Sequence, residues 1–478
     1  MIPLSPQEIA DAVGGSLFGV SDAAAPVVTS VVADSRETVP GSLFVAVAGE
    51  RVDGHDYAGS CLAAGAVLVL SARPLNDDDG VPMPCVVVDD PVLALGRLAA
   101  WYRRERLQAR VVGVTGSSGK TSTKDLIARV LSSSAPTVSP RGSFNTEVGL
   151  PLTILTADET TRFLVLEMGM RGEGHISYLA ECASPDIGVV LNVGSAHLGL
   201  LGSREAIARA KSELVRALSP SGVAVLNGDD PLVRAMSEVT PARVVTFGES
   251  SSSDVRATDV RIDDRARPSF TLTLQGDAGA APISLQLSGE HYVSNALAAA
   301  TVGQIAGLSI EQIADALRAA EIDNRWRMEI RESSQGVTVI NDAYNANPES
   351  MRAALKSLAA MAAGRRTWAV LGEMRELGDA SVEEHDGIGR LAVRLDISRL
   401  VCVGEGTRVM HLGASSEGSW GEESIHVPDI EAAIALLEEN VTSGDLVLVK
   451  ASRAIGLERV AEALLAAEPD GEHPEDPA

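Results

Sequence analysis

The stretch Val111-Val-Gly-Val-Thr-Gly-Ser-Ser-Gly-Lys-Thr-Ser-Thr-Lys124 decides the fold of this chain. An apolar run leads into a glycine loop that ends in Gly119-Lys120-Thr121, and a helical pattern follows. Glycines let backbone N–H groups point at phosphate oxygens, the lysine supplies a cation for the outer phosphates, and the threonine hydroxyl can reach Mg²⁺. The stretch therefore predicts a strand, a phosphate-binding loop and a helix whose positive dipole end faces the phosphates.

The loop is shorter than the full Walker pattern, which carries a glycine where this chain has Val114. This departure disfavours a generic ATPase. A glycine turn without a ligand is the alternative, but chance seldom supplies a strand, two glycines, a lysine and a threonine in register. We predict that a nucleoside triphosphate binds the loop residues Thr115, Gly116, Ser117, Ser118, Gly119, Lys120, Thr121 and Ser122.

The composition of the chain excludes several classes of function. A length of 478 residues suggests two to four domains, and 40 basic against 65 acidic residues disfavour nonspecific binding to nucleic acid or to an anionic membrane. We therefore predict no nucleic-acid partner. Four cysteines without paired spacing, Cys61, Cys85, Cys182 and Cys402, indicate reduced core thiols rather than a zinc site or a disulfide framework.

The two ends of the chain bear on its location. The N-terminus lacks a basic segment followed by an apolar one, and no later run approaches the ~20 apolar residues that cross a bilayer. We therefore expect a soluble, cytoplasmic protein without an integral membrane segment. The acidic, proline-containing segment 467–478 is predicted to be a disordered tail.

The hydrophobic pattern predicts an α/β fold with three domains. Residues 1–108 mix short apolar runs with turns and form a small α/β unit. Residues 109–324 alternate strands and helices, which predicts a P-loop-type parallel sheet. Within that domain, the alternating pattern around 240–287 predicts added antiparallel strands beside the sheet. Strands and alanine-rich helices over 325–466 predict a Rossmann-like third domain.

Polar residues that directly follow apolar runs are candidate ligands, because ligands collect at the carboxyl ends of strands. Glu167 follows one such run and is predicted to bind Mg²⁺ together with Thr121. The alternative is an ordinary acid at a strand end. His197 follows the next run, although a lone histidine is more often a hydrogen-bonded structural residue than a ligand.

Lys211 lies on the apolar stripe of the helix predicted at 203–218, where an amine must be paired or neutralised. One solution is a side chain that extends to the edge of the core. The other is carbamylation, which converts the amine into an anion that holds a second Mg²⁺ together with His197. The periodicity favours neither.

Several motifs of this chain occur in the order in which the Mur ligases carry them, and the chain resembles that family over nearly its whole length. The motifs are Thr115-Gly-Ser-Ser-Gly-Lys-Thr121, Glu167-Met-Gly, Ala196-His, Ala210-Lys211, Ser294-Asn-Ala-Leu-Ala-Ala and Asn341-Asp-Ala-Tyr-Asn-Ala-Asn-Pro348. More narrowly, the last motif and Leu371-Gly-Glu-Met-Arg-Glu-Leu-Gly378 resemble the branch that handles D-alanyl-D-alanine. The N-terminal Asp34-Ser-Arg and the segment 41–56 fit the same family.

The resemblance implies an ADP-forming ligase of peptidoglycan synthesis, with ATP and Mg²⁺ as cofactors. It would join D-Ala-D-Ala to UDP-MurNAc-tripeptide through an acyl phosphate, and the prediction for its oligomeric state is a monomer. The first domain would then hold the UDP substrate and the central domain ATP. The alternatives are another Mur ligase, a folylpolyglutamate-type ligase, or a nucleotide-gated binding module that catalyses no ligation.

The resemblance also implies roles for individual residues, each of which could instead be a solvated loop residue. Catalysis would depend on Lys120, Lys211, His197 and Arg327. Asn295 would contact adenine, Arg327 the phosphates and Asp342 the ribose. The predicted substrate-binding residues are Ser35 and Arg36 for the UDP-sugar, Asn145 and Thr146 for the incoming substrate, and Asn345, Asn347, Lys450 and Arg453 for the dipeptide or its activated partner. The predicted metal ligands are Thr121, Glu167, His197 and carbamylated Lys211.

Two departures from the family pattern concern the third domain. Asn341 stands where many relatives carry a second acid, and Asn324-Arg-Trp precedes Arg327 where Pro-Gly is common. These differences affect the expected loop conformation and the phosphate contacts.

Overall fold

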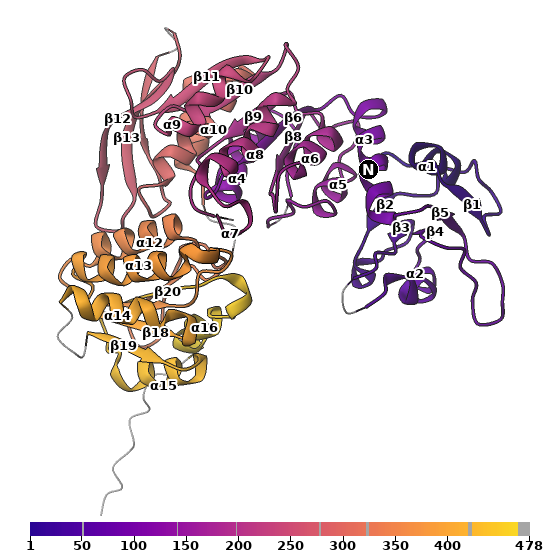
Figure 1. The fold of residues 1–478 in the computed structure, drawn as a ribbon. Coiled ribbons are helices and arrows are strands. Elements are labelled where there is room, and N and C mark those ends of the chain that lie inside the picture. The colour runs from indigo at the N-terminus through magenta and orange to yellow at the C-terminus, as the bar shows by residue number, and fades with distance from the viewer. Residues whose placement is uncertain are drawn as a thin grey trace, which may run out of the picture.

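Three β-sheets with flanking helices follow one another along the chain (Figure 1). The structure is a computed structural model that describes residues 1–49, 52–140, 142–196, 198–276, 279–321, 325–418 and 423–466. The predicted α/β class with three sheet regions is confirmed. The candidate ligand His197 and the predicted tail 467–478 lie outside the described residues. Among the described ranges, no helix combines the length and apolar character that a membrane span requires.

The first sheet has the strand order β1-β5-β4-β3-β2, with β2 to β5 parallel and β1 antiparallel. Leu43 and Leu68 pack with α1 and α3, whereas Phe44 and Val69 face α2, as the alternation of side chains along a strand requires. The elements are α1 (Pro6–Val13), β1 (Ser16–Phe18), β2 (Ser30–Val32), β3 (Ser42–Val45), α2 (Ala58–Ala63), β4 (Leu68–Ser71), β5 (Cys85–Val87) and α3 (Pro91–Glu105).

The second sheet has the order β14-β13-β12-β11-β10-β9-β6-β8-β7 and is parallel from β7 through β12. The antiparallel prediction for 240–287 is therefore wrong for β11, which pairs in parallel with β10. Antiparallel pairing begins between β12 and β13. The strands are β6 (Arg110–Thr115), β7 (Thr137–Val138), β8 (Phe163–Glu167), β9 (Ile187–Val190), β10 (Val223–Asn227), β11 (Arg243–Gly248), β12 (Val255–Ile262), β13 (Pro268–Thr273) and β14 (Ala280–Ser284).

Helices cover both faces of the second sheet, which explains its nearly continuous apolar strands. Val112 and Val114 of β6 belong to the core beneath α4 and α10, whereas Val111 belongs to the core beneath α6 and α8. The helices are α4 (Lys120–Ser132), α5 (Gly149–Ile154), α6 (His175–Ala183), α7 (Leu198–Leu201), α8 (Arg204–Arg216), α9 (Pro231–Arg234), α10 (Tyr292–Ala306) and α11 (Ile310–Arg318).

The third sheet has the order β15-β16-β20-β17-β18-β19 and is parallel except at β15. Ile340 and Leu371 pack beneath α12 to α14, and Val339 and Val370 pack beneath α15 and α16. The elements are β15 (Glu329–Glu332), β16 (Thr338–Asn341), α12 (Pro348–Met361), β17 (Thr367–Leu371), α13 (Ser381–Arg394), β18 (Arg399–Val403), α14 (Arg408–Glu417), β19 (Ser424–Val427), α15 (Ile430–Asn440), β20 (Leu446–Lys450) and α16 (Glu458–Ala466). Short 3₁₀ helices include η1 (Ser35–Glu37), η4 (Gly378–Ala380) and η6 (Arg453–Ile455).

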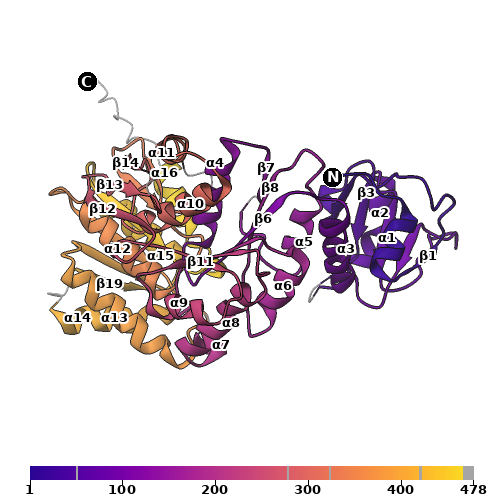
Figure 2. The same ribbon diagram turned by 90° about the horizontal axis from the view of Figure 1, so that it is seen from above.

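The central unit lies between the other two (Figure 2). The third unit contacts it beside the glycine loop, where Glu349 at the start of α12 accepts hydrogen bonds from Ser195 N at 2.8 Å and Ser195 Oγ at 3.0 Å. A second contact joins Gly199 N to Glu376 O at 3.2 Å. The four cysteines are buried and free, in agreement with core thiols.

Candidate active site

The glycine loop lies at the carboxyl end of β6, inside the central sheet. Gly119 is the N-cap of α4 and has a φ of +76°, a conformation that side chains with a Cβ rarely adopt. A Cβ at this position would also lie 2.9 Å from Asn295 Oδ1. Lys120 bends back over the loop, and its Nζ donates to Gly116 O at 2.8 Å. The loop has the conformation that a phosphate-binding turn requires.

Asn192 lies two residues beyond the end of the neighbouring strand β9 and holds the loop, and the sequence reasoning missed it. Its Oδ1 accepts hydrogen bonds from the backbone N–H groups of Ser117 and Ser118, both at 2.9 Å. Its amide group donates back to Ser118 O at 3.2 Å. Asn192 directly follows an apolar run, so the rule that selected Glu167 could have found it.

Two predicted loop residues use their side-chain hydroxyls in hydrogen bonds to the backbone. Thr115 is buried, and its Oγ1 donates to Met168 O at 2.9 Å. Ser117 Oγ accepts from Gly194 N at 2.9 Å. These hydrogen bonds attach the loop to neighbouring backbone segments, and the predicted contacts of both residues with a nucleotide stay predictions.

The predicted magnesium ligands Thr121 and Glu167 are in contact. Thr121 Oγ1 donates to Glu167 Oε2 at 2.8 Å, and Asn145 Nδ2 donates to Glu167 Oε1 at 2.7 Å. Thr121 and Glu167 are 2% and 1% exposed. Hard oxygen donors therefore meet beside the phosphate loop, which is the chemistry that Mg²⁺ prefers.

Lys211 is buried in the core, as its place on the apolar stripe of α8 predicts. Its residue exposure is 1%, and its Nζ lies 4.0 Å from Met170 Sδ, a weak acceptor. Burial, reinforced by the charge of Lys120, moves the pKa of Lys211 well below its ordinary value. The lowered pKa shifts this amine toward its neutral form. Side-chain extension to the edge of the core is thus the weaker of the two explanations.

A cleft of about 1450 Å³ opens above the loop, between the central and third units. We call it the loop cleft. Its walls bring together predicted residues from distant parts of the sequence, namely Lys120, Thr121, Asn145, Glu167, Asn295, Arg327, Asp342, Asn345, Asn347 and Lys450. Asn295 is 5% exposed, and its Nδ2 is buried without a hydrogen-bond partner among the described residues. This amide is available to a ligand in the cleft.

The charged residues of the third unit are paired in this cleft. Lys450 ends β20, and its Nζ lies 2.6 Å from Asp342 Oδ2 at the end of β16. Arg327 stacks on the ring of Tyr344, with its guanidinium carbon 4.0 Å from the ring centroid. Tyr344 OH also hydrogen-bonds Ser143 Oγ of the central unit. Lys450 and Asp342 thus form one ion pair, which the sequence reasoning had treated as two separate candidates.

His291 and Tyr292 form the floor of the cleft at the start of α10. Burial lowers the pKa of His291 to about 4, so the imidazole is neutral at physiological pH. Its Nδ1 is buried without a hydrogen-bond partner in the described part of the chain. His291 was not predicted, because it lies between the alternating segment and α10 and does not directly follow an apolar run.

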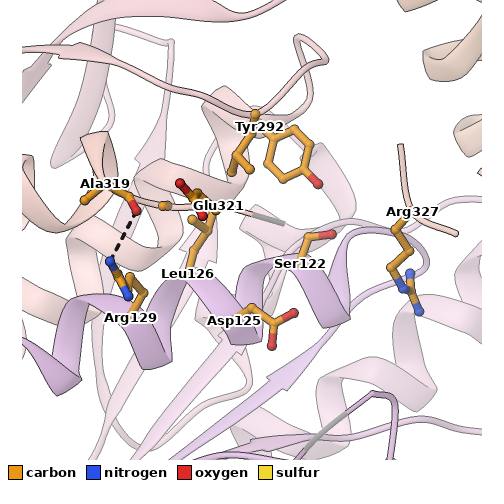
Figure 3. A pocket seen from close by; sticks show the side chains of 10 residues that line it. Ser122, Asp125, Leu126, Arg129, Tyr292, Ala319, Glu321 and Arg327 are labelled. Atoms are coloured by element: carbon orange, nitrogen blue, oxygen red, sulfur yellow. Dashed lines mark hydrogen bonds between the residues drawn. The ribbon is translucent and has the colours of Figure 1, made fainter. Parts of the chain in front are cut away.

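A smaller pocket of about 600 Å³ adjoins the loop cleft, and both are lined by Ser122, Tyr292 and Arg327. Figure 3 shows Ser122 and Asp125 on α4 below the pocket, with Tyr292 above it and Arg327 at one side. The shared residues extend the cleft along the first turns of α4.

A further cavity of about 1250 Å³ lies on the other side of Lys120, and we call it the outer cleft. Lys120, Asn145 and Asn345 line both clefts. Thr146 lines the outer cleft, as do Asp90, Val92 and Leu93 near the start of α3. A group bound in one cleft can therefore meet a group bound in the other at Lys120.

The remaining candidates have local roles in the structure. Asn347 is the N-cap of α12, and its Oδ1 accepts from Ser350 N at 2.9 Å. Arg453 stacks on Trp326 at 4.2 Å and pairs with Glu458 at 2.6 Å. Ser35 and Arg36, both described, lie in η1 of the first unit and line neither cleft. Substrate binding by these four residues stays a prediction.

The loop cleft and the outer cleft meet at the lysine of the phosphate loop, and the third α/β unit contacts the central unit beside this loop. This arrangement is that of a nucleotide-dependent enzyme with a second substrate site. The sequence matches three domain families in chain order. They are described as Mur ligase family, catalytic domain, at 27–103, Mur ligase middle domain at 114–303, and Mur ligase, glutamate ligase domain, at 326–453. The chain belongs to the Mur ligase family.

The relatives within this family share one description. Proteins named UDP-N-acetylmuramoyl-tripeptide–D-alanyl-D-alanine ligase are 48% identical in Mycobacterium leprae, 34% in Bacillus subtilis and 33% in Escherichia coli. Each alignment covers 97% of this chain and 99% of the relative. A MurF structure from Acinetobacter baumannii matches with a TM-score of 0.87 at 31% identity, over 97% of this chain and 99% of that one. MurF from Thermotoga maritima in complex with ADP matches with a TM-score of 0.78 at 30% identity, over 92% and 97%.

Proposed function

We propose that this protein is an ATP-dependent ligase that joins D-alanyl-D-alanine to UDP-N-acetylmuramoyl-tripeptide in peptidoglycan synthesis. Its full-length relatives carry this activity in their names. The observation that carries the proposal is the position of Lys120, which lines both the loop cleft and the outer cleft. A ligase of this kind must bring the outermost phosphate of ATP to a carboxylate, and one cation at the junction of two clefts suits that task.

The three sheet regions suggest how the substrates are divided. We propose that residues 1–108 bind the UDP-sugar, with Ser35 and Arg36 among the contacts, that residues 109–324 bind ATP, and that residues 325–466 close the site. The described contacts between Glu349 and Ser195 and between Gly199 and Glu376 support closure of the third unit over the glycine loop. Because ATP and UDP-linked precursors occur in the cytoplasm, we place the reaction there, in a monomer whose single chain lines both clefts.

The first chemical step joins the substrate carboxylate to phosphorus. An oxygen of the tripeptide's terminal carboxylate attacks the γ-phosphorus of ATP, the bond to the β-phosphate oxygen breaks, and ADP leaves. Two anions must approach each other in this step. Lys120 lies at the junction and Arg327 lines the loop cleft, so their charges offset the repulsion.

The second step forms the amide. The ammonium group of D-Ala-D-Ala first loses a proton to water, and the neutral amine then attacks the acyl carbon. A tetrahedral intermediate forms, the nitrogen loses a second proton, and inorganic phosphate leaves as the amide closes. Asn145 and Asn345 line both clefts and can donate hydrogen bonds to the acyl phosphate. The protein accelerates both steps by holding the reacting groups in position, and no protein side chain acts as a covalent nucleophile.

Mg²⁺ fits the residues beside the loop. Thr121 Oγ1 and Glu167 Oε2 lie 2.8 Å apart, and we propose that they hold Mg²⁺ directly or through water. A bound Mg²⁺ ion would neutralise charge that develops on the phosphate oxygens. The buried amine of Lys211 supports carbamylation, because a neutral amine reacts with CO₂. We propose that the carbamate holds a second Mg²⁺ together with His197, which lies outside the described residues.

The substrate requirement of phosphate release tests this function. We expect release of inorganic phosphate from ATP only when UDP-MurNAc-tripeptide and D-Ala-D-Ala are both present, with one amide formed per phosphate. ATP hydrolysis that is indifferent to both substrates would indicate a nucleotide-gated binding module instead. Turnover with a single amino acid in place of D-Ala-D-Ala would indicate a different branch of the family, and turnover with a folate substrate a folylpolyglutamate-type ligase.

A further inference from the structure

The loop that follows β17 carries Glu376 in an unusual backbone conformation. Glu376 has a φ of +66°, the left-handed region that glycine adopts without strain and other residues rarely occupy. Strain of this kind persists where the surroundings over-determine it, and it concentrates at sites of function. The conformation of Glu376 is therefore a reason to examine what surrounds this residue.

The surroundings hold this loop from several directions. Met374 N donates to Nε2 of the buried His385 at 3.0 Å, and His385 Nδ1 donates in turn to Ser381 O at 2.7 Å. Arg375 N donates to Ser452 Oγ at 2.9 Å. The two residues that precede Glu376 along the chain are thus fixed within the third unit.

The same loop also touches the central unit. Glu376 O accepts a hydrogen bond from Gly199 N at 3.2 Å. A Cβ at Gly199 would lie 2.5 Å from Gly378 N, so the two backbones approach as closely as glycine permits. The position of Glu376 therefore depends on the contact between the two units.

Glu376 lines the outer cleft together with Lys120 and Asn145. Apart from Asn345, it is the one residue of the third unit among the described residues that line this cleft. Glu376 therefore lines the cleft that also contains Lys120, where the two clefts meet.

We propose that the Glu376 carboxylate binds the ammonium group of D-Ala-D-Ala and places its nitrogen beside the acyl phosphate. This inference rests on the function proposed above. An ammonium group has three donors and a positive charge, which a carboxylate accepts in a short, charge-assisted hydrogen bond. The third unit brings this carboxylate to the cleft when it contacts the central unit, so dipeptide binding follows closure.

Kinetics of the Glu376→Gln and Glu376→Gly variants test the proposal. Both should raise KM for D-Ala-D-Ala about 10- to 100-fold, the effect of losing a hydrogen bond to a charged group. KM for ATP and for UDP-MurNAc-tripeptide should change less than about twofold. Gly suits the positive φ and keeps the backbone bond to Gly199, so a Glu376→Gly variant with wild-type KM for the dipeptide would overturn the proposal.

Glu373→Gln is the matched control. Glu373 lies on the same loop and pairs with Arg375 at 3.7 Å. It lines a pocket beside the carboxyl ends of β18 and β19 and does not line the outer cleft. This variant should keep all three KM values. Acyl phosphate trapped from ATP and the tripeptide alone should form at the wild-type rate in every variant. Its absence from the wild type would contradict the ligase function itself, whereas a raised KM for the tripeptide in Glu376→Gln would assign the carboxylate to that substrate and overturn the proposal.

A dipeptide analogue without the amine tests the proposed contact between the Glu376 carboxylate and the ammonium group by changing the substrate. Propionyl-D-alanine keeps the shape of D-Ala-D-Ala but lacks the amine. The wild-type enzyme should bind it, as a competitor of D-Ala-D-Ala, about 10- to 100-fold more weakly than the dipeptide. Glu376→Gln should bind the analogue and the dipeptide about equally. An undiminished preference for the dipeptide in this variant would show that the amine is bound elsewhere.

Discussion

Thr121 Oγ1 donates a hydrogen bond of 2.8 Å to Glu167 Oε2, and this bond joins the first turn of α4 to the end of the neighbouring strand β8. Because β6 and β8 pair in parallel, the loop after β6 and the last residue of β8 meet at the same edge of the sheet. The bond therefore brings two oxygen ligands to the phosphate loop.

Replacement of Glu167 tests the metal role of this pair. Glu167→Gln should raise the Mg²⁺ concentration for half-maximal phosphate release at least about tenfold, because the amide is a poorer ligand than the carboxylate. A titration of activity with Mg²⁺ measures this effect. Glu181→Gln, on the exposed face of α6, is the control and should keep the wild-type curve. An unchanged Mg²⁺ requirement in Glu167→Gln would contradict the metal assignment.

Removal of the loop lysine should separate chemistry from substrate binding. We expect Lys120→Ala to lower the rate of phosphate release about 100- to 1000-fold, because the loop loses its charge at the junction of the clefts. Binding of the UDP-substrate, measured by calorimetry, should change little. The exposed Lys356 on α12 supplies a control, and Lys356→Ala should have wild-type activity. Retained turnover in Lys120→Ala would rule out the phosphate-binding role.

Carbamylation of Lys211 has a spectroscopic signature. After incubation with ¹³C-bicarbonate, the wild-type protein should give a carbamate resonance that Lys211→Ala lacks. The low pKa of the buried amine favours this adduct, because only the neutral form reacts with CO₂. Short carboxylic acids should partly restore the activity of Lys211→Ala. If the wild-type protein lacks this resonance, the lysine is unmodified, and the proposed second metal site is refuted.

The ion pair between Lys450 and Asp342 should stabilise the third unit. Their side chains are 3% and 14% exposed, so removal of either partner leaves a charge in a mostly buried place. Lys450→Met and Asp342→Asn should each cost about 3 kcal/mol, whereas the double variant should cost less than the sum. Melting temperatures of the four proteins measure this coupling. Strictly additive shifts would mean that the pair contributes no interaction energy.

His291 should make stability depend on pH. Its pKa falls from 6.5 to about 4 on burial, so between these pH values the unfolded chain binds more protons than the folded one. The contribution of His291 to the free energy of unfolding is therefore constant above pH 6.5. Below pH 6.5 this free energy falls as the pH falls toward 4, and the loss is about 2 kcal/mol at pH 5. Acidification from pH 7 to pH 5 should lower the melting temperature of the wild type more than that of His291→Gln. Equal losses would show that the histidine does not stay neutral.

The local sequence pattern was sufficient to predict those site residues that lie within, or directly after, a single helix or strand. The glycine loop and Glu167 followed from strand ends, and the burial of Lys211 followed from the stripe on α8. These predictions depend on periodicity and on chain neighbours, which a sequence displays directly.

Strand order was not available from the same pattern. Lys450 and Asp342 meet because β20 lies between β16 and β17, although the two residues are 108 positions apart. The parallel pairing of β11 was missed because an alternating pattern is the same for both strand directions. Glu376 lies in the motif 371–378 but was not singled out as a site residue. Its proposed role depends on a backbone conformation and on a contact between units, which periodicity does not indicate.

The most direct test of the ligase follows one oxygen atom. UDP-MurNAc-tripeptide labelled with ¹⁸O in its terminal carboxylate is incubated with ATP, Mg²⁺ and D-Ala-D-Ala, and the released phosphate is examined by mass spectrometry. Because Lys120 lies where the two clefts meet, the carboxylate oxygen should attack phosphorus and remain there, giving one ¹⁸O in each phosphate. Unlabelled phosphate released together with the amide product would contradict the acyl-phosphate mechanism.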